Sequence, residues 1–193
     1  MEETIEEIFS LYAKFGAADY IGEPVSQIEH MSQSAELAMR EGYDDEVVLA
    51  AFFHDIGHIC VLNADHQSMN GYGVHRHEKI GADYLRAKGF GEKVAMLVEN
   101  HVQAKRYLTY RYPAYFSALS EASKMTLEFQ GGRMSQEEAD RFERHPFFEE
   151  SILMRKWDEL AKETGKAILD LNVLKDKART VLARQSSLRS IKP

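Results

Sequence analysis

The chain has 193 residues, of which 44% are hydrophobic and 28% are charged. This balance is typical of one globular domain with a core large enough to fold alone. The formal net charge of −7 argues against a phosphate backbone as the main partner, so we expect no nucleic acid. There is no apolar run of about 18 residues, the first residues Met1–Thr4 are acidic where a signal peptide is basic, and the lone Cys60 cannot form an internal disulfide. We therefore predict a cytoplasmic protein with no membrane partner.

The hydrophobic pattern predicts an all-α chain. Apolar residues recur with helical spacing almost throughout, and no segment shows the sustained alternation that is typical of strands. Turn and capping residues separate the helices; for example, Gly42 ends one helix and Asp44 begins the next. In chain order, we expect helices at about 3–15, 25–41, 45–59, 77–88, 92–107, 114–129, 135–144, 147–163 and 166–185.

Two segments are predicted to be irregular. Residues 60–76 are polar and form a loop that is longer than most, so they are a candidate lid over a site. Residues 185–193 are predicted to be a flexible tail. No composition shift or linker divides the chain, and we expect residues 1–193 to form a single domain.

The end of the third predicted helix carries an unusual set of polar residues. The apolar run Leu49–Phe53 is followed at once by His54 and Asp55, and His58 lies one turn after His54. Burying such groups without partners would cost roughly 1–3 kcal/mol per lost hydrogen bond, and more for an ionised carboxylate. A transition metal would compensate, because imidazole and carboxylate are ligands that such metals prefer. We therefore expect a metal site here.

Other histidines extend this set. The chain has eight histidines, and His30, His77 and His101 also lie in helical contexts beside apolar residues. With Asp55 and the late Asp158, they supply four imidazoles and two carboxylates, enough for two metal ions that share Asp55. Each histidine alone is more often structural, but the joint occurrence favours a metal centre. We expect the remaining histidines to lie in loops or solvent: His66, His75 and His145.

The order His … His-Asp … His … His … Asp on an all-helical chain resembles the HD-domain superfamily. The resemblance implies an all-α HD-domain helical bundle. Most members are metal-dependent phosphohydrolases, whereas a smaller branch contains mixed-valent di-iron oxygenases, namely myo-inositol oxygenase and the PhnZ-type and TmpB-type enzymes of phosphonate catabolism. The spacings are similar to those of the phosphonate branch over nearly the whole chain. Tyr20 and Glu23 resemble its substrate-gating pair, which phosphohydrolases do not need.

The resemblance implies a set of metal ligands. The first iron would be held by His30, His54, Asp55 and Asp158, and the second by His77, His101 and Asp55. The bridging Asp55 would let one iron stay Fe(II) while the other is Fe(III). Tyr20 would occupy the open position of the second iron until substrate displaces it.

The resemblance also implies substrate contacts. His58 and Lys105 would bind the phosphonate, and with Tyr20 and Glu23 they would take part in both binding and catalysis. Three residues on one stripe of the following helix are candidates for the same anion, although ordinary helix polarity explains them equally well: Ser123, Thr126 and Gln130. Arg133 is a further cation that we do not include.

The implied reaction uses O2 to cleave the carbon–phosphorus bond of a 1-hydroxy-2-(amino or trimethylammonio)ethylphosphonate. The products would be glycine or glycine betaine and inorganic phosphate. The carboxylate of Glu23 favours an ammonium group. A trimethylammonium group usually prefers aromatic faces, and the sequence assigns no aromatic cage, so the choice between the two stays open.

Two other functions remain as alternatives. One is an HD phosphohydrolase that uses Mn, Co or Ni on a nucleotide or small phosphate ester, and the other is a non-catalytic regulatory module. The complete ligand set argues against a regulatory module, while Tyr20, Glu23 and Lys105 favour the oxygenase over the hydrolase. The partner is then a small phosphonate, and the oligomeric state is left open.

Overall fold

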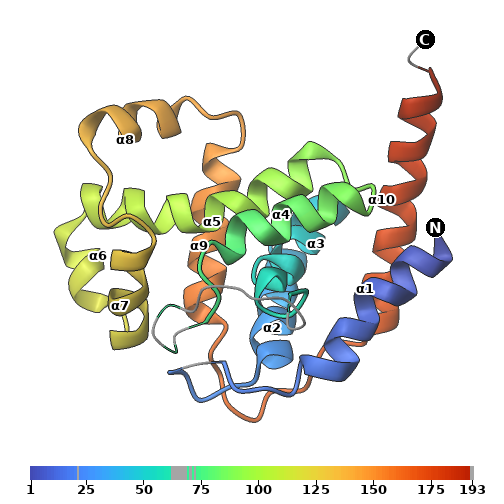
Figure 1. The fold of residues 1–193 in the computed structure, drawn as a ribbon, viewed down its shortest axis with the longest axis horizontal. Helices are drawn as coiled ribbons and strands as arrows, with labels where there is room; N and C mark the ends of the chain where they lie inside the picture. Colours follow the sequence, from blue (N-terminus) through green and yellow to red (C-terminus); the bar gives the residue numbers. More distant parts are fainter. Residues whose placement is uncertain (21, 62–68, 70, 72, 192–193) are drawn as a thin grey trace.

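The computed structural model describes residues 1–20, 22–61, 69, 71 and 73–191. These residues form ten α-helices, one 3₁₀ turn and no strand, which confirms the all-α prediction. The elements in chain order are α1 (Glu2–Phe15), α2 (Gln27–Arg40), α3 (Asp45–Phe53), η1 (Ile56–His58), α4 (His77–Ala87), α5 (Glu92–Arg111), α6 (Pro113–Ala118), α7 (Glu121–Phe129), α8 (Gln136–Glu143), α9 (Phe148–Leu160) and α10 (Leu171–Ile191) (Figure 1). None of the helices in these ranges has an apolar stretch long enough to cross a membrane.

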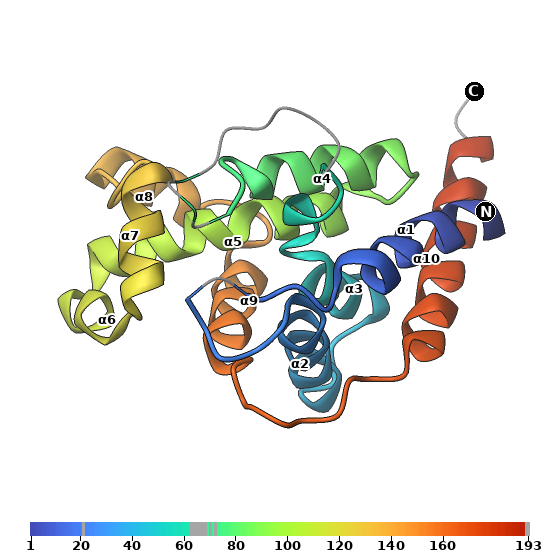
Figure 2. The same cartoon turned by 60° about the horizontal axis from the view of Figure 1, so that its bottom comes forward.

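Helix α3 is the centre of the main core. All its residues from Val47 to Phe53 are buried, and a helix that is apolar on every face must be surrounded by other elements. It packs against α2, α5, α9 and α10. Figures 1 and 2 show α1 and α10 side by side at one end of the molecule, with α6, α7 and α8 at the other end. The residues that follow α3 are therefore delivered to the middle of the fold.

Helix α5 joins the main core to a second, smaller one. Its first half contributes Val94, Leu97 and Val98 to the main core, whereas Ala104 and Tyr107 pack in a second cluster with residues of the α8 region. Between these two halves lie the residues of α5 that face the predicted site. A side chain at this junction can contact both α3 and the α6–α8 end of the molecule.

The structure differs from the predicted elements in three places. The predicted helix 114–129 is two helices, because Leu119 is extended and the side chain of Ser120 caps α7 by accepting from the backbone N–H of Ser123. Helix α3 ends at Phe53, and the chain continues into η1. Helix α10 begins and ends later than expected, so residues 185–191 are helical, while the flexibility of the tail 185–193 stays a prediction.

The proposed lid 60–76 falls largely on residues 62–68, 70 and 72, which lie outside the described ranges. The single-domain organisation of residues 1–193 stays a prediction.

Candidate metal centre

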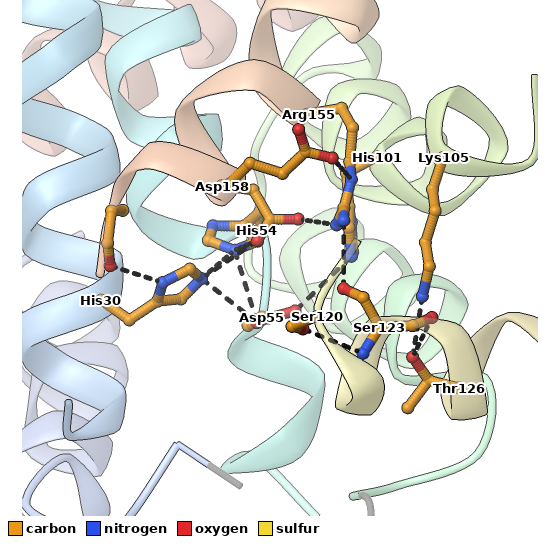
Figure 3. A network of polar contacts seen from close by, with 12 residues as sticks. His30, His54, Asp55, His101, Lys105, Ser120, Ser123, Thr126, Arg155 and Asp158 are labelled. Carbon is orange, nitrogen blue, oxygen red and sulfur yellow. Dashed lines mark hydrogen bonds and ion pairs between the residues drawn. The ribbon is translucent and has the colours of Figure 1, made fainter. Parts of the chain in front are cut away.

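Two groups of buried ligands lie next to each other and share one carboxylate. The first contains His30, His54 and Asp55, and the second contains Asp55, His77 and His101. Within each group, the ligand atoms lie within 4.8 Å of one another. The residues come from α2, from the chain at the end of α3, from the first residue of α4 and from the middle of α5. Figure 3 shows several of these side chains converging on Asp55.

All four imidazoles are oriented by backbone carbonyl groups. The Nδ1–O distances are 2.9 Å for His30 to Ala161, 2.8 Å for His54 to Ala51, 2.6 Å for His101 to Val98 and 3.3 Å for His77 to Val74. A carbonyl oxygen only accepts, so each Nδ1 carries the hydrogen and each Nε2 of a neutral ring presents a lone pair. This arrangement is typical of histidines that bind metals through Nε2.

The Nε2 atoms face each other at distances that suit ligands of a shared metal ion. The Nε2–Nε2 distance is 3.0 Å between His30 and His54, and 3.2 Å between His77 and His101. Asp55 completes both groups, with Oδ2 at 3.3 Å from His54 Nε2 and Oδ1 at 3.2 Å from His77 Nε2. Metal bonds of about 2.1 Å place neighbouring ligands about 3 Å apart. The donor set therefore fits one metal ion in each group, with Asp55 between them.

The electrostatics of the two groups differ. Burial alone would lower the pKa of His54, but Asp55 and Asp158 raise it to about 9, so the first group attracts a proton when no metal competes. Burial would raise the pKa of Asp55, yet His54 and His77 hold it well below its usual range. Burial lowers the pKa of His101 to about 3, which leaves its Nε2 free to bind a metal.

Asp158 closes the first group from helix α9. Its Oδ1 atom lies 3.4 Å from His30 Nε2 and 4.0 Å from His54 Nε2, and its Oδ2 atom is paired with Arg155. Burial would raise the pKa of Asp158, but the charge of Arg155 holds it well below its usual range. The sequence analysis missed Arg155, although its position three residues before Asp158 on a helix is a signal for such a pair.

Local structure brings these ligands together. In α2, Ser26 and Glu29 form a reciprocal capping box that fixes the start of the helix, and Glu29 directly precedes His30. At the end of α3, Gly57 lets η1 approach the start of α4, because a Cβ atom at Gly57 would lie 1.9 Å from the carbonyl oxygen of His77. This close approach places His77 beside Asp55.

A cavity of about 270 Å³ adjoins the second group. Asp55, His77 and His101 contribute to its wall. The structure brings every predicted substrate residue to this cavity: Tyr20, Glu23, His58, Lys105, Ser123, Thr126 and Gln130. Gln27 and Arg155 line it as well and were not expected from the sequence. The metal groups and the expected substrate contacts therefore form one continuous site.

Lys105 presents a buried amine to this cavity. Its side chain is directed towards α7, where Nζ donates to Thr126 Oγ1 at 2.7 Å and to Gln130 Oε1 at 2.9 Å (Figure 3). The residue is 2% exposed, and no carboxylate of the described residues lies within ion-pair distance of Nζ. Burial lowers the pKa of Lys105 well below its usual value, and the charge of Arg155 lowers it further. Such an amine is suited to bind an anion that enters the cavity.

His58 is a neutral hydrogen-bond donor. Its Nδ1 accepts from the backbone N–H of Val74 at 3.0 Å, so its hydrogen lies on Nε2. The ring stacks on His77 with centroids 4.0 Å apart, and burial lowers the pKa of His58 to about 3. Gly73 adopts φ +101°, and a Cβ there would lie 2.6 Å from Cε1 of His58. Gly73 and Val74 thus fit closely against the imidazole of His58.

Tyr20 lies over the first group. Its ring stacks on His30 with centroids 3.9 Å apart, and burial together with the nearby charges of Asp55 and Asp158 raises the pKa of its hydroxyl well above the usual value. The turn that carries it is closed by backbone hydrogen bonds of 2.9 Å from Tyr20 N–H to Val25 and from Glu23 N–H to Tyr20. Tyr20 therefore lies near the shared carboxylate, while its predicted displacement by substrate stays a prediction.

The remaining histidines lie outside both groups. His75 contacts the carbonyl oxygen of Phe129 at 3.2 Å, and His145 lies 3.3 Å from the amide nitrogen of Asn100. His66 is outside the described residues. Arg133 packs over the ring of Phe116, with the guanidinium carbon 4.4 Å from the ring centre.

Comparison with known proteins places the chain among related sequences. Residues 28–163 match the HD domain family. The chain is 45% identical to an uncharacterized protein of Acanthamoeba polyphaga mimivirus over 88% of its own length and 78% of the relative. It is 38% identical to the hydroxymethylphosphonate dioxygenase of Gimesia maris, covering 88% of this chain and 83% of the relative. It is 39% identical to the glycine-betaine-forming [1-hydroxy-2-(trimethylamino)ethyl]phosphonate dioxygenase of Leisingera caerulea, covering 82% and 80%.

Proposed function

Since the chain belongs to the HD-domain family and is related to phosphonate dioxygenases over most of its length, we propose that it is a di-iron oxygenase that cleaves the carbon–phosphorus bond of a 1-hydroxyphosphonate. The substrate R–CH(OH)–PO₃²⁻ and O2 would give R–COO⁻, HPO₄²⁻ and a proton. The carbon–phosphorus and carbon–hydrogen bonds break, and O2 accepts the four electrons that the substrate loses.

The observation that carries this proposal is the second ligand group beside the cavity. Two imidazoles and one carboxylate, those of His77, His101 and Asp55, with an accessible side are typical of Fe(II) sites that react with O2. The first group has an additional carboxylate from Asp158 and is covered by Tyr20. When bound, iron would supply redox chemistry and orient the substrate oxygens. The Fe(II)/Fe(III) pair is part of this proposal.

The chain's own residues would bind and orient the phosphonate. The Nζ of Lys105 and the guanidinium of Arg155 supply positive charge, and the hydroxyls of Ser123 and Thr126 lie within hydrogen-bond distance of these cations. The Nε2–H of His58, which also lines the cavity, is a further hydrogen-bond donor. Charge-assisted bonds from fixed donors would hold the phosphonate so that the hydroxyl-bearing carbon faces the second group.

Tyr20 would control access to the shared carboxylate. Its ring stacks on His30 and it lines the cavity together with Asp55, so a substrate hydroxyl that approaches this region would compete for the same place. Gln27 has a buried Oε1 atom without a hydrogen-bond partner, which suits the hydrogen of a substrate hydroxyl. These two residues would position the carbon end of the substrate.

The proposal covers the unit that the relatives' substrates share. Hydroxymethylphosphonate and the trimethylamino compound both contain a hydroxyl on the carbon that bears phosphorus. An amino or trimethylammonio group, with glycine or glycine betaine as product, is the class that Glu23 alone favours. In this structure, Glu23 is paired with Lys162, which bears on that choice.

The metal content tests the proposal against a phosphohydrolase. Protein purified in air is expected to contain two iron ions per chain and, after mild reduction, to show an electron paramagnetic resonance signal of a coupled Fe(II)/Fe(III) pair. Addition of hydroxymethylphosphonate should change this signal and then yield formate and phosphate. Protein that binds no iron but hydrolyses p-nitrophenyl phosphate with Mn, Co or Ni would contradict the oxygenase and support the hydrolase.

A further inference from the structure

Glu23 lines the cavity and forms an ion pair with Lys162. Its Oε1 atom is 2.5 Å from Nζ of Lys162 and accepts a hydrogen bond from Ser120 Oγ at 2.7 Å. The side chains of Glu23 and Lys162 are 11% and 21% exposed, respectively. The carboxylate of Glu23 therefore already has a cationic partner in Lys162 and a hydroxyl donor in Ser120.

The segment that carries Lys162 is fixed to the metal centre. The carbonyl oxygen of Ala161 accepts from His30 Nδ1, and Glu163 exchanges two backbone–side-chain hydrogen bonds of 2.9 and 3.0 Å with the buried Gln33 of α2. Lys162 lies between these two anchored residues. Its backbone cannot move away without breaking the contact that orients a ligand histidine, so its ammonium group is held near Glu23.

The charges around the cavity are therefore unequal. Lys105 donates to Thr126 and Gln130 and has no carboxylate within ion-pair distance among the described residues, so it is available to the anion of a substrate. Glu23 is already paired with Lys162, so its carboxylate does not need a cation from the substrate. An ammonium group on the substrate would have to displace Lys162 or lie beside a like charge.

Besides Glu23 and the aspartates of the metal groups, the carboxylate that lines the cavity is that of Asp19, which is exposed, so solvent screens its charge. In the described part of the chain, the phenyl and phenol rings that line the cavity are those of Phe15 and Tyr20, and Tyr20 already has one face on His30. Gln27 offers a neutral acceptor without net charge. Recognition of a quaternary ammonium group usually uses several aromatic faces. The substituent end of this cavity thus suits hydrogen or a small alkyl group.

We infer that Lys162 is a specificity-determining residue that neutralises Glu23 and makes the site select 1-hydroxyphosphonates with an uncharged substituent over those with an ammonium group. This inference rests on the proposed function and narrows its substrate class. The selection acts through binding, because Lys162 does not line the part of the cavity next to the metal groups.

Two substrates of nearly equal shape test the inference. (1-Hydroxypropyl)phosphonate and (1-hydroxy-2-aminoethyl)phosphonate differ by a methyl group in place of an ammonium group. With the iron-loaded protein in air, phosphate release should favour the propyl compound by about tenfold in kcat/KM, mainly through KM, which is the scale of one partly exposed charge contact. Lys162→Met should remove this preference, and Lys162→Arg should retain it.

Lys166 supplies a matched control. It lies in the same connecting segment, its side chain is 22% exposed, and its Nζ is 2.9 Å from Glu36, away from the cavity. Lys166→Met should leave the substrate preference unchanged. Cleavage of both compounds with a ratio that Lys162→Met does not alter, or a wild-type preference for the amine, would overturn the inference while the proposed function stands. If wild-type protein releases phosphate from neither compound nor from hydroxymethylphosphonate, the proposed function fails and the inference fails with it.

Discussion

Replacement of Lys105 by Met should separate substrate binding from stability. The Met side chain has a similar length to that of Lys but carries no amine. The substitution therefore removes the buried amine and leaves the metal ligands in place. A hydrogen bond between an amine and a charged phosphonate contributes about 1.5–3 kcal/mol. KM should therefore rise roughly 10- to 150-fold. Phosphate release measured over a range of hydroxymethylphosphonate concentrations gives this value.

The same variant should lose little stability. Thr126 Oγ1 keeps its bond to the carbonyl oxygen of Ala122 at 3.0 Å, and Gln130 is half-buried and can bind water. Because removing a buried cation also removes its desolvation cost, the free energy of unfolding should change by about 1 kcal/mol or less. Lys93→Met is the control, since Lys93 lies on the same helix and pairs with Asp44 at 2.6 Å, away from the cavity. An unchanged KM in Lys105→Met with full metal content would refute the assignment of Lys105 to the phosphonate.

Four further outcomes follow from the site. Asp55→Ala should lose both metal ions, as measured by elemental analysis; full iron would show that Asp55 does not bridge. Tyr20→Phe should keep its iron and its stacking on His30 but change substrate affinity measured by calorimetry without O2, and an unchanged affinity would exclude the gating role. Gly57→Ala should reduce the free energy of unfolding by about 3 kcal/mol, since the new Cβ would collide with the carbonyl oxygen of His77; a stable variant in urea unfolding would contradict this contact. Burial lowers the pKa of Lys105 in the folded state, so between that lowered pKa and about 10.4 only the unfolded chain binds the proton. The free energy of unfolding of metal-free protein should therefore rise with pH in this window. An identical rise in Lys105→Met would assign the pH dependence to other groups.

The ligand set could be anticipated because its residues violate the ordinary composition of a core helix. The pair His54 and Asp55 follows a run that is fully buried in the structure, so a compensating partner was required wherever the helix lay. The substrate role of Lys105 was implied by the family resemblance; helical spacing places it one turn from His101, and in the structure this side chain meets α7. Such placements depend on local periodicity, which a sequence displays directly.

The sequence could not identify the contacts of Arg155 with Ser123 and of Lys162 with Glu23. Their partners Ser123 and Glu23 are 32 and 139 residues away in the chain, so only the packing of α7 and of the segment after α9 brings them together. The break between α6 and α7 was also not predicted. Ser120 lies at this break, where it caps α7 and donates to the distant Glu23. Long-range polar contacts of this kind have no periodic signal.

Dependence on O2 tests the central proposal most directly. Iron-loaded protein would be mixed with hydroxymethylphosphonate under argon and then exposed to measured amounts of O2, while phosphorus nuclear magnetic resonance follows the phosphonate and the phosphate. The account predicts no phosphate under argon and one phosphate for each O2 consumed. Equal release of phosphate with and without O2 would show that the site hydrolyses its substrate and would contradict the account.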